Sequence, residues 1–435
     1  MKINALLDVN LVAHETEDEV TVLLELEAPA ALADVTRPQA SLEVVLDRSG
    51  SMAGPPLEGA KKALTDLVRR LEPTDNFGLV AFDDSAQVVV PAGPLTDKEA
   101  VLAQIAAVYP GGSTDLSAGY LRGLREIRRV AQHGGTVLVV SDGHVNAGIT
   151  QVDEFASITS KAYSDGIVTS TLGYGHGYDE TMLAAIARSG SGNHVFAHDP
   201  DAAGAAIAGE VDGLLNKVVQ ALSLTVAFEP SVQFLRLYND LPAQQIANGQ
   251  VMIELGDLYA EETRKVLLQL KVPALADLGL TKVATLELAY VELPGLIEHV
   301  ASLPISVNVV PGDEAAGRIP HPTVESEKLF QDAQVAKREA SEAFERGAFT
   351  EGQRLLGETK RRLSRSLEVA PEALKPDIRA EMDDVERMER YGDASGAGGS
   401  AAMSKMTRAS YTDRSRKRGR RIEPRNRPEQ DGPTA

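Results

Sequence analysis

The stretch SLEVVLDRSGSM, residues 41–52, joins a mainly apolar strand pattern to a loop rich in side-chain oxygen atoms. Its first seven residues predict a strand that is buried on both faces of a sheet. Pro55 and Pro56 follow at a position that favours the first turn of a helix. Apolar residues then recur at helical spacing, namely Leu57, Ala60, Leu64, Leu67, Val68 and Leu71. A buried strand followed by an amphipathic helix indicates the repeating unit of a parallel α/β sheet.

The same alternation of strand and helix patterns continues to about residue 220. Further strands are predicted at 77–82, 136–142, 167–173 and 194–197. Helices are predicted at 97–108, 116–131, 152–164, 179–188 and 201–219. We therefore expect residues 38–220 to form one Rossmann-like α/β domain with a mostly parallel sheet.

A different periodicity flanks this domain on both sides. Residues 221–312 contain apolar side chains at every second position between Pro, Gly and Asn turns, which predicts an antiparallel β-sandwich. Within residues 1–37, the runs 3–12 and 20–26 are also strand-like, but an isolated strand pair is only marginally stable in water. We expect these strands to complete the sandwich, so that the α/β domain is an insertion in it. The alternative is that they extend the α/β sheet.

The last third of the chain changes to a helical pattern and then to a polar one. Residues 320–391 are expected to be helical, with one apolar stripe that includes Ala333, Ala340 and Phe344. Between Lys405 and Arg427 there are ten Lys or Arg residues against two acidic residues. With its small and charged composition, the segment 392–435 is predicted to be a disordered basic tail.

Oxygen side chains follow the predicted strands at one edge of the expected sheet. Asp47, Ser49 and Ser51 occupy alternate positions after the first strand, Thr114 precedes a helix, and Asp142 ends the strand 136–142. In open parallel sheets, ligands bind outside the carboxyl ends of the strands. Taken singly, each fragment could be a helix cap or a turn. Together, these hard oxygen donors predict one divalent cation, with Mg²⁺ favoured over Mn²⁺ or Ca²⁺ and with zinc and copper excluded.

Three segments around these residues resemble the metal ion-dependent adhesion site of the von Willebrand factor A family. They are DRSGSM at 47–52, GGSTDL at 111–116 and SDG at 141–143. The resemblance covers residues 41–220, and no position of the motif departs from the family pattern. It implies that Ser49, Ser51 and, in the ligand-competent state, Thr114 contact the metal, whereas Asp47 and Asp142 act mainly through water. It also implies cation-dependent binding of a partner protein that offers an Asp or Glu carboxylate. The wider sequence is similar to bacterial proteins distantly related to inter-α-trypsin inhibitor heavy chains.

Composition sets limits on the function. The chain has 435 residues, a formal net charge of -19 and no cysteine. Such a charge repels polyanions, so nucleic acid is not expected as the main ligand. Without cysteine, a reducing cytoplasm is a suitable compartment, and neither an export signal nor a membrane span is expected. We therefore predict a cytoplasmic adaptor or signalling scaffold without enzymatic activity.

Two other functions stay open from the sequence. A metal-dependent hydrolase would need an acid or base beside the site, and His144 is the one histidine in these loops. His144 could instead contact a partner at the rim of the metal site. The second alternative is a binder of polyanions or nucleic acid that acts through the basic C-terminal tail.

Overall fold

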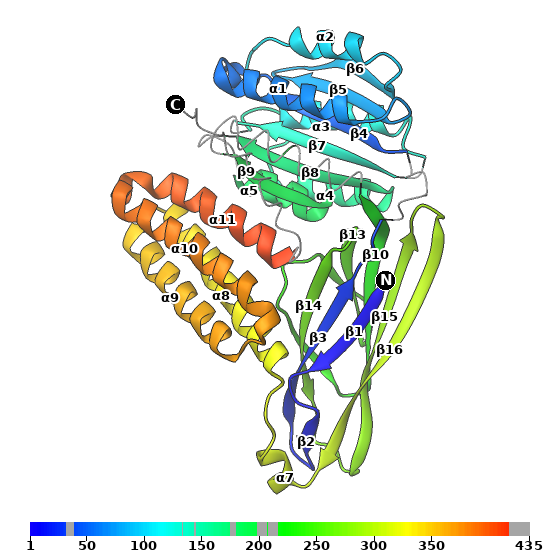
Figure 1. The fold of residues 1–435 in the computed structure, drawn as a ribbon, viewed down its shortest axis with the longest axis vertical. Coiled ribbons are helices and arrows are strands. Elements are labelled where there is room, and N and C mark those ends of the chain that lie inside the picture. The colour runs from blue at the N-terminus through cyan, green and yellow to red at the C-terminus, as the bar shows by residue number, and fades with distance from the viewer. Residues whose placement is uncertain are drawn as a thin grey trace, which may run out of the picture.

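The structure, a computed structural model, describes residues 1–31, 39–132, 134–142, 145–174, 180–197, 207 and 216–416. These residues form an α/β domain, a β-sandwich and a helical region (Figure 1). The α/β domain stands at one end of the elongated sandwich, and the helices lie alongside both. In this part of the chain, no helix has the length and apolar character that crossing a membrane requires.

A six-stranded sheet in the order β6-β5-β4-β7-β8-β9 forms the centre of the α/β domain. All neighbours are parallel except β5 and β6, which are antiparallel. Each residue of the central strand β4 is buried. The strands are β4 (Ser41–Asp47), β5 (Asn76–Phe82), β6 (Ala86–Pro94), β7 (Gly135–Ser141), β8 (Ile167–Tyr174) and β9 (Ser191–Ala197).

Helices cover both faces of this sheet, so the domain has two apolar cores. Side chains of α1 and α2 fill the core on one face, and those of α3, α4 and α5 fill the core on the other. The helices are α1 (Pro55–Arg70), α2 (Lys98–Ala106), α3 (Leu116–Ile127), α4 (Val152–Ser164) and α5 (Glu180–Ser189). The predicted α/β class with a mostly parallel sheet is confirmed.

Two details of this domain differ from the sequence-based expectation. Strand β6 was not predicted, because Pro91 and Pro94 interrupt its pattern, but an edge strand tolerates residues that cannot donate to a ladder. The helix predicted at 201–219 is wrong at its end, since a strand, β10, already begins at Lys217. Alternating burial along that strand fits a half-buried sheet position better than a helix. Of the predicted helix before Lys217, the structure describes Ile207 and Asn216. The other residues from 201 to 215 lie outside the described part of the chain.

The β-sandwich contains strands from both sides of the α/β domain. One sheet has the order β1-β3-β14-β11 and the other β12-β13-β10-β15-β16-β2. Strand β3 pairs with β14 along its whole length, from Glu27 opposite Thr263 to Asp18 opposite Val272. The strands are β1 (Lys2–Leu7), β2 (Leu11–Ala13), β3 (Asp18–Glu27), β10 (Lys217–Phe228), β11 (Gln233–Leu237), β12 (Ala243–Ala247), β13 (Gln250–Tyr259), β14 (Thr263–Val272), β15 (Gly279–Glu292) and β16 (Ile297–Val310). The N-terminal strands thus belong to the sandwich and not to the α/β sheet, and the α/β domain is inserted between its parts.

The helical region is longer than the sequence predicted. A short helix α7 (Gly312–Ala316) precedes α8 (Pro322–Glu345), α9 (Phe349–Val369), α10 (Lys375–Ser395) and α11 (Ser400–Arg416). The end of α10, a short 3₁₀ helix (Gly396–Gly399) and α11 lie within the predicted disordered tail, and that prediction is wrong for residues 392–416. Met403 and Tyr411 are buried, and the Ser341 hydroxyl donates to the Ser404 carbonyl at 2.9 Å. Small residues and serine contacts mediate this packing, so the sequence of α11 has no strong apolar stripe from which a packed helix could be predicted. Residues 417–435 lie outside the described part of the chain.

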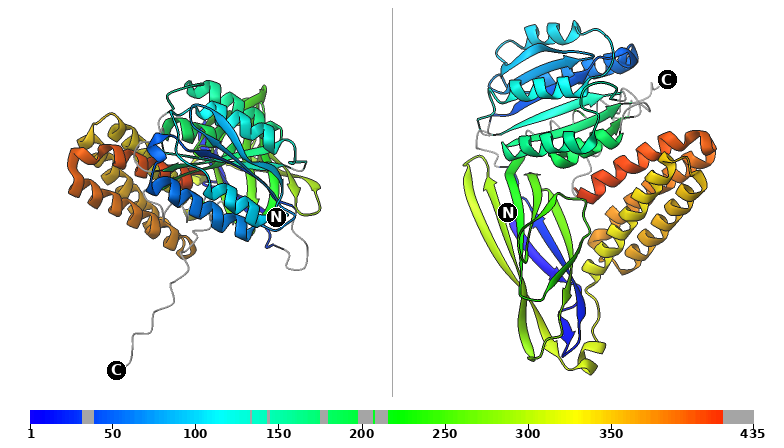
Figure 2. Two further views of the ribbon diagram at one scale, coloured as in Figure 1. Left: turned by 90° about the horizontal axis from the view of Figure 1, so that it is seen from above. Right: turned by 180° about the vertical axis from the view of Figure 1, so that it is seen from behind.

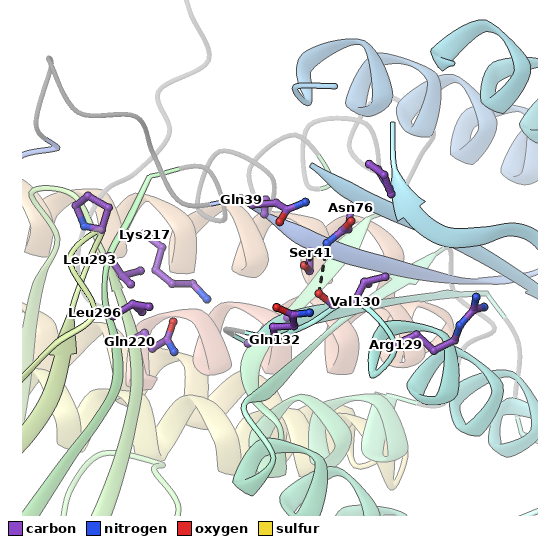
Figure 3. A pocket seen from close by; sticks show the side chains of 15 residues that line it. Gln39, Ser41, Asn76, Arg129, Val130, Gln132, Lys217, Gln220, Leu293 and Leu296 are labelled. Carbon is purple, nitrogen blue, oxygen red and sulfur yellow. Dashed lines mark hydrogen bonds between the residues drawn. The ribbon is translucent and has the colours of Figure 1, made fainter. Parts of the chain in front are cut away.

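A cavity of about 550 Å³ lies where the α/β domain meets the sandwich. Figure 3 shows Gln39, Ser41 and Asn76 on the α/β side facing Lys217 and Leu296 on the sandwich side. Ser41 and Asn76 begin β4 and β5. The cavity is therefore at the amino ends of these strands, at the opposite edge of the sheet from Asp47.

Candidate metal centre

Asp47 ends β4 and is fully buried. Its Oδ1 accepts a hydrogen bond from the Ser49 backbone N–H at 2.8 Å, and its Oδ2 accepts one from the Ser141 hydroxyl at 2.6 Å. Burial raises the pKa of Asp47, and the hydrogen bonds from Ser141 and Ser49 offset part of that rise. The carboxylate therefore fixes the start of its own loop to the end of the neighbouring strand β7.

Ser49, Ser51 and Asp142 form a chain of side-chain oxygens next to Asp47. The two serine Oγ atoms are 3.1 Å apart, and the Ser51 hydroxyl donates to Asp142 Oδ1 at 3.0 Å. Ser49 and Asp142 are buried, whereas Ser51 is exposed. The structure therefore brings four of the five predicted ligand residues together, and the cluster opens toward solvent at Ser51.

The charge of this cluster favours a cation. Burial raises the pKa of Asp142 to about 6, and the nearby Asp47 carboxylate adds to the rise, while the hydrogen bond from Ser51 opposes it. A cation next to two such carboxyl groups would stabilise their charged forms. Among the described residues, no group of three or more His, Cys, Asp or Glu side chains could hold a metal ion, so the hydroxyls are needed for this site. The donor set fits a hard divalent cation.

Thr114, the fifth predicted ligand, is buried in the loop that precedes α3. Its backbone N–H donates to Asn146 Oδ1 at 3.0 Å, and its carbonyl accepts from the backbone N–H of Asn146 at 3.3 Å. In the described part of the chain, its links to the cluster run through the backbone. The loop is joined to the Asp47 loop where Gly50 N–H donates to the Gly112 carbonyl at 3.0 Å. Among the described residues, Thr114 is thus linked to the cluster through the backbone of its loop.

An ion pair beside the cluster was missed from the sequence. Arg48 contacts Asp83 at 3.0 Å, and the Asp83 carbonyl accepts from the Asp115 backbone N–H at 2.7 Å. Burial alone would raise the pKa of Asp83, but hydrogen bonds from Ser85 and the charge of Arg48 outweigh it and leave the pKa lowered. The signal was available, because Asp83 directly follows β5 at the same edge as Asp47. This pair joins the loops that follow β4 and β5 and the loop that carries Thr114.

The histidine predicted at the rim cannot be placed. His144 lies outside the described residues, as does His198. His194, which is also near the end of a strand, is buried, and its Nδ1 is 2.8 Å from the Thr171 hydroxyl. His194 is therefore a core residue whose ring nitrogen has a hydrogen-bond partner.

The model of the von Willebrand factor type A domain family matches residues 42–206, the part that carries this cluster. The chain contains a von Willebrand factor type A domain. This domain holds all five predicted ligand residues, and the sandwich and the helical region lie outside the matched range.

Several relatives of known sequence are similar to part or most of this chain. The uncharacterized protein sll0103 of Synechocystis is 29% identical over 164 residues, which is 38% of this chain and 39% of that protein. Human inter-alpha-trypsin inhibitor heavy chain H1 is 25% identical over 171 residues, 37% of this chain and 19% of that protein. The E3 ubiquitin-protein ligase WAV3 of Arabidopsis thaliana is 24% identical over 80% of this chain and 46% of its own length. The chain thus spans less than half the length of each of these relatives.

Two solved structures share the architecture of nearly the whole chain. A von Willebrand factor type A protein from Catenulispora acidiphila superposes with a TM-score of 0.71 at 16% identity, over 94% of this chain and 96% of that one. The ArnB paralog VWA2 from Sulfolobus acidocaldarius gives a TM-score of 0.63 at 15% identity, over 94% and 97%. At these identities the likeness shows the fold. The arrangement of von Willebrand domain, sandwich and helices is therefore a recurring one.

Proposed function

We propose that the chain binds a protein partner through one divalent cation held by Asp47, Ser49, Ser51, Thr114 and Asp142. Von Willebrand factor type A domains mediate protein–protein interactions, often in a metal-dependent way. The observation that supports the proposal is the oxygen chain from Ser49 through Ser51 to Asp142, with contacts of 3.1 and 3.0 Å, beside the buried Asp47. Mg²⁺ is the proposed ion, with Mn²⁺ or Ca²⁺ as substitutes.

The choice of partner chemistry follows from the donors. If neutral hydroxyls supply the direct protein contacts, the cation keeps much of its charge and can attract one more carboxylate. We therefore propose that the partner offers an Asp or Glu side chain. The chain's net charge of -19 opposes an acidic partner at long range, but salt screens such repulsion beyond about 8 Å. The role proposed is that of a non-enzymatic adaptor in the cytoplasm.

Calorimetric titration with Mg²⁺ tests the metal site. Asp142→Asn should lose saturable Mg²⁺ binding, because it removes one of the two carboxylates of the cluster. Asp115→Asn is the matched control, since it removes the same charge from the same edge of the sheet. Asp115 caps α3 by accepting from the Ala118 backbone N–H at 2.9 Å, and Asn is also a good cap. Equal Mg²⁺ affinity in both variants would place the ion elsewhere.

Affinity capture then tests the use of the site. Wild type in Mg²⁺ should retain a partner that is lost in EDTA and lost with Asp142→Asn, but kept with Asp115→Asn. Retention of the same partner in EDTA would overturn the metal-dependent mechanism, even if the ion binds.

A further inference from the structure

In the described part of the chain, most of the outer edge of β16 in the larger sandwich sheet has no neighbouring strand. Strand β2 pairs with Asn308, Val309 and Val310 on that edge. Before Asn308, β15 is the one strand that pairs with β16 among the residues that the structure describes. Figure 2 shows from behind that this flank of the sandwich faces away from the helical region, as it does in Figure 1. The first half of β16 is therefore an edge at which another strand can add.

The contact with the β2 segment shows which backbone groups of β16 point outward. The Asn308 N–H donates to the Asn10 carbonyl at 2.8 Å, on the side away from β15. Because outward and inward groups alternate along an antiparallel strand, the even-numbered residues of β16 direct their N–H and C=O groups outward. The register shift between the two strands adds Val283 to β15 and leaves the alternation along β16 intact. The outward residues in the first half of the strand are therefore Glu298, Val300 and Ser302.

Pro304 limits this open edge to the start of β16. Proline has no N–H, and at position 304 the missing donor faces outward, where an edge strand tolerates it. From Ile297 to Leu303 the strand contains no proline, and its register with β15 is regular. Strands β11 and β12, at other edges of the sandwich, each contain a register shift. The run 297–303 thus keeps a regular edge with its hydrogen-bonding groups directed outward.

Apolar side chains lie on both faces of this run. On the outer face, Val300 is 68% exposed. On the inner face, Ala301 and Leu303 pack against the sandwich core, and Ile297, which shares their face, is 55% exposed. Pairing with another strand would cover these side chains and remove their apolar surface from water.

We propose that the run 297–303 pairs antiparallel with the same run of a second copy of this chain, about a two-fold axis at Val300. Val300 then lies opposite its own copy, and Ile297 lies opposite Leu303. The charged Glu298 faces a serine, so no like charges lie opposite each other. Outward residues face outward residues in this register, and each such pair can exchange both N–H···O=C hydrogen bonds. The segment is thus complementary to itself, which is why the proposed occupant is a second copy.

Pro304 also selects the position of the axis. With the axis at Val300, Pro304 lies opposite Leu296, which is outside the strand, so its missing N–H costs no hydrogen bond. With the axis at Ala301, Pro304 would face Glu298, and one hydrogen bond of that pair would be lost. The register about Val300 therefore uses the outward groups of the run completely.

Sedimentation equilibrium of the full chain across a dilution series tests this dimer. EDTA in the buffer prevents the candidate metal centre from linking two copies. Wild type should show a reversible equilibrium of monomer and dimer. Val300→Lys should weaken dimerisation about tenfold or more, because it removes an apolar pair at the axis and places two ammonium groups there. Ser302→Pro should also weaken it, since the outward N–H of Ser302 is lost.

The matched control is Ile246→Lys. Ile246 is 48% exposed and belongs to β12, which ends the same sheet at its other edge. This variant makes the same apolar-to-charged change away from β16, so it should dimerise like wild type. A wild type that stays monomeric throughout the series would leave the β16 edge to a strand of another protein and overturn the second copy as its occupant. A dimer that Val300→Lys and Ser302→Pro leave intact would overturn this edge as the interface.

Thiol cross-linking tests the register, since the chain has no cysteine. Opposite residues of a hydrogen-bonded antiparallel pair have Cα atoms about 5.5 Å apart, within the range of about 4.4–6.8 Å for disulfides. Oxidation should therefore link two copies of Val300→Cys but not two copies of Ile246→Cys. A mixture of Glu298→Cys and Ser302→Cys should link as heterodimers. Faster linking of Glu298→Cys alone than of this mixture would overturn the pairing proposed.

Discussion

Glu43 lies in the middle of β4, four positions before Asp47, and is fully buried. Neither of its carboxyl oxygens has a hydrogen-bond partner among the described residues. Burial raises the pKa of Glu43 to about 9; the nearby Glu126 adds to this rise, and Arg122 opposes it. At neutral pH this side chain is therefore a neutral acid inside the sheet, whereas an unfolded chain would carry it as a carboxylate.

Replacing Glu43 by Gln should change how stability depends on pH. The pKa is higher in the folded state than the ordinary 4.5, so folding retains a proton that the unfolded chain releases. The contribution is complete below pH 4.5 and is lost as the pH rises toward about 9. In that window, wild type should lose up to about 1.4 kcal/mol per pH unit relative to Glu43→Gln. Urea unfolding of both proteins at a series of pH values measures this difference, and parallel curves would contradict it.

At the scale of residues, the sequence predicted that Asp47, Ser49, Ser51 and Asp142 lie together, but not all of their contacts. Asp47 and Asp142 could be placed at one edge because each follows a strand of a parallel sheet. The hydrogen bond of Ser141 to Asp47 and the ion pair of Arg48 with Asp83 were not predicted. These contacts depend on strand order and side-chain rotamers, which an apolar pattern does not specify.

At the scale of elements, α3 sets the position of the Thr114 loop through two glycines. A Cβ atom on Gly123 would lie 2.5 Å from a Val45 methyl group, and one on Gly119 would lie 2.6 Å from the Phe82 ring. The helix therefore packs closer to β4 and β5 than a larger residue would permit. This contact holds the N-terminal end of α3, and the loop before it, against the edge of the sheet at which β4 and β5 end.

Gly123→Ala should consequently destabilise the protein, although Ala is the better helix former. Overpacking of this kind costs typically about 1–3 kcal/mol. Gly357→Ala in α9 is the control, because nothing lies within 4 Å of its Cβ position. There the substitution should stabilise the protein by about 0.5–1 kcal/mol. Thermal and urea unfolding should show opposite signs for the two variants, and a neutral Gly123→Ala would mean that α3 can shift outward.

Strand β6 and helix α11 are elements that the apolar pattern of the sequence does not predict. The prolines of β6 interrupt its strand pattern, and they are tolerated because β6 is an edge strand. Helix α11 is rich in small and basic residues and has few apolar ones, although its Met403 packs with Ala340 and Ala343 of α8. Both elements are defined by their neighbours more than by their own periodicity.

At the scale of the whole molecule, the insertion of the von Willebrand domain was predictable, because two N-terminal strands had no partner within their own segment. What the sequence could not give was their register or their sheet. Strand β3 lies between β1 and β14, and its side chains Val22, Leu24 and Leu26 belong to the sandwich core. The position of the helices beside both domains likewise depends on long-range contacts such as that of Arg408 with Glu180 at 3.0 Å.

Deletion of residues 1–28 should therefore disrupt the sandwich while the von Willebrand domain stays folded. Without β3, strand β14 has a free edge and exposes buried side chains, so the variant should aggregate. Light scattering and limited proteolysis, with the peptide 1–28 added back as a control, measure both effects. A monomeric variant with an intact, protease-resistant sandwich would show that β3 is dispensable.

The pairing of β3 with β14 also has a consequence during synthesis of the chain. Glu27 pairs with Thr263, which lies about 240 residues later in the chain. At about 5–20 residues per second, a ribosome needs roughly 10–50 s to synthesise the residues between them. The inserted von Willebrand domain emerges complete in that interval and contains its own two cores. It can thus fold first, and its two ends, at the same side of its sheet, then bring the early and late strands of the sandwich together. The inserted domain would thereby shorten the loop that the last pairing has to close.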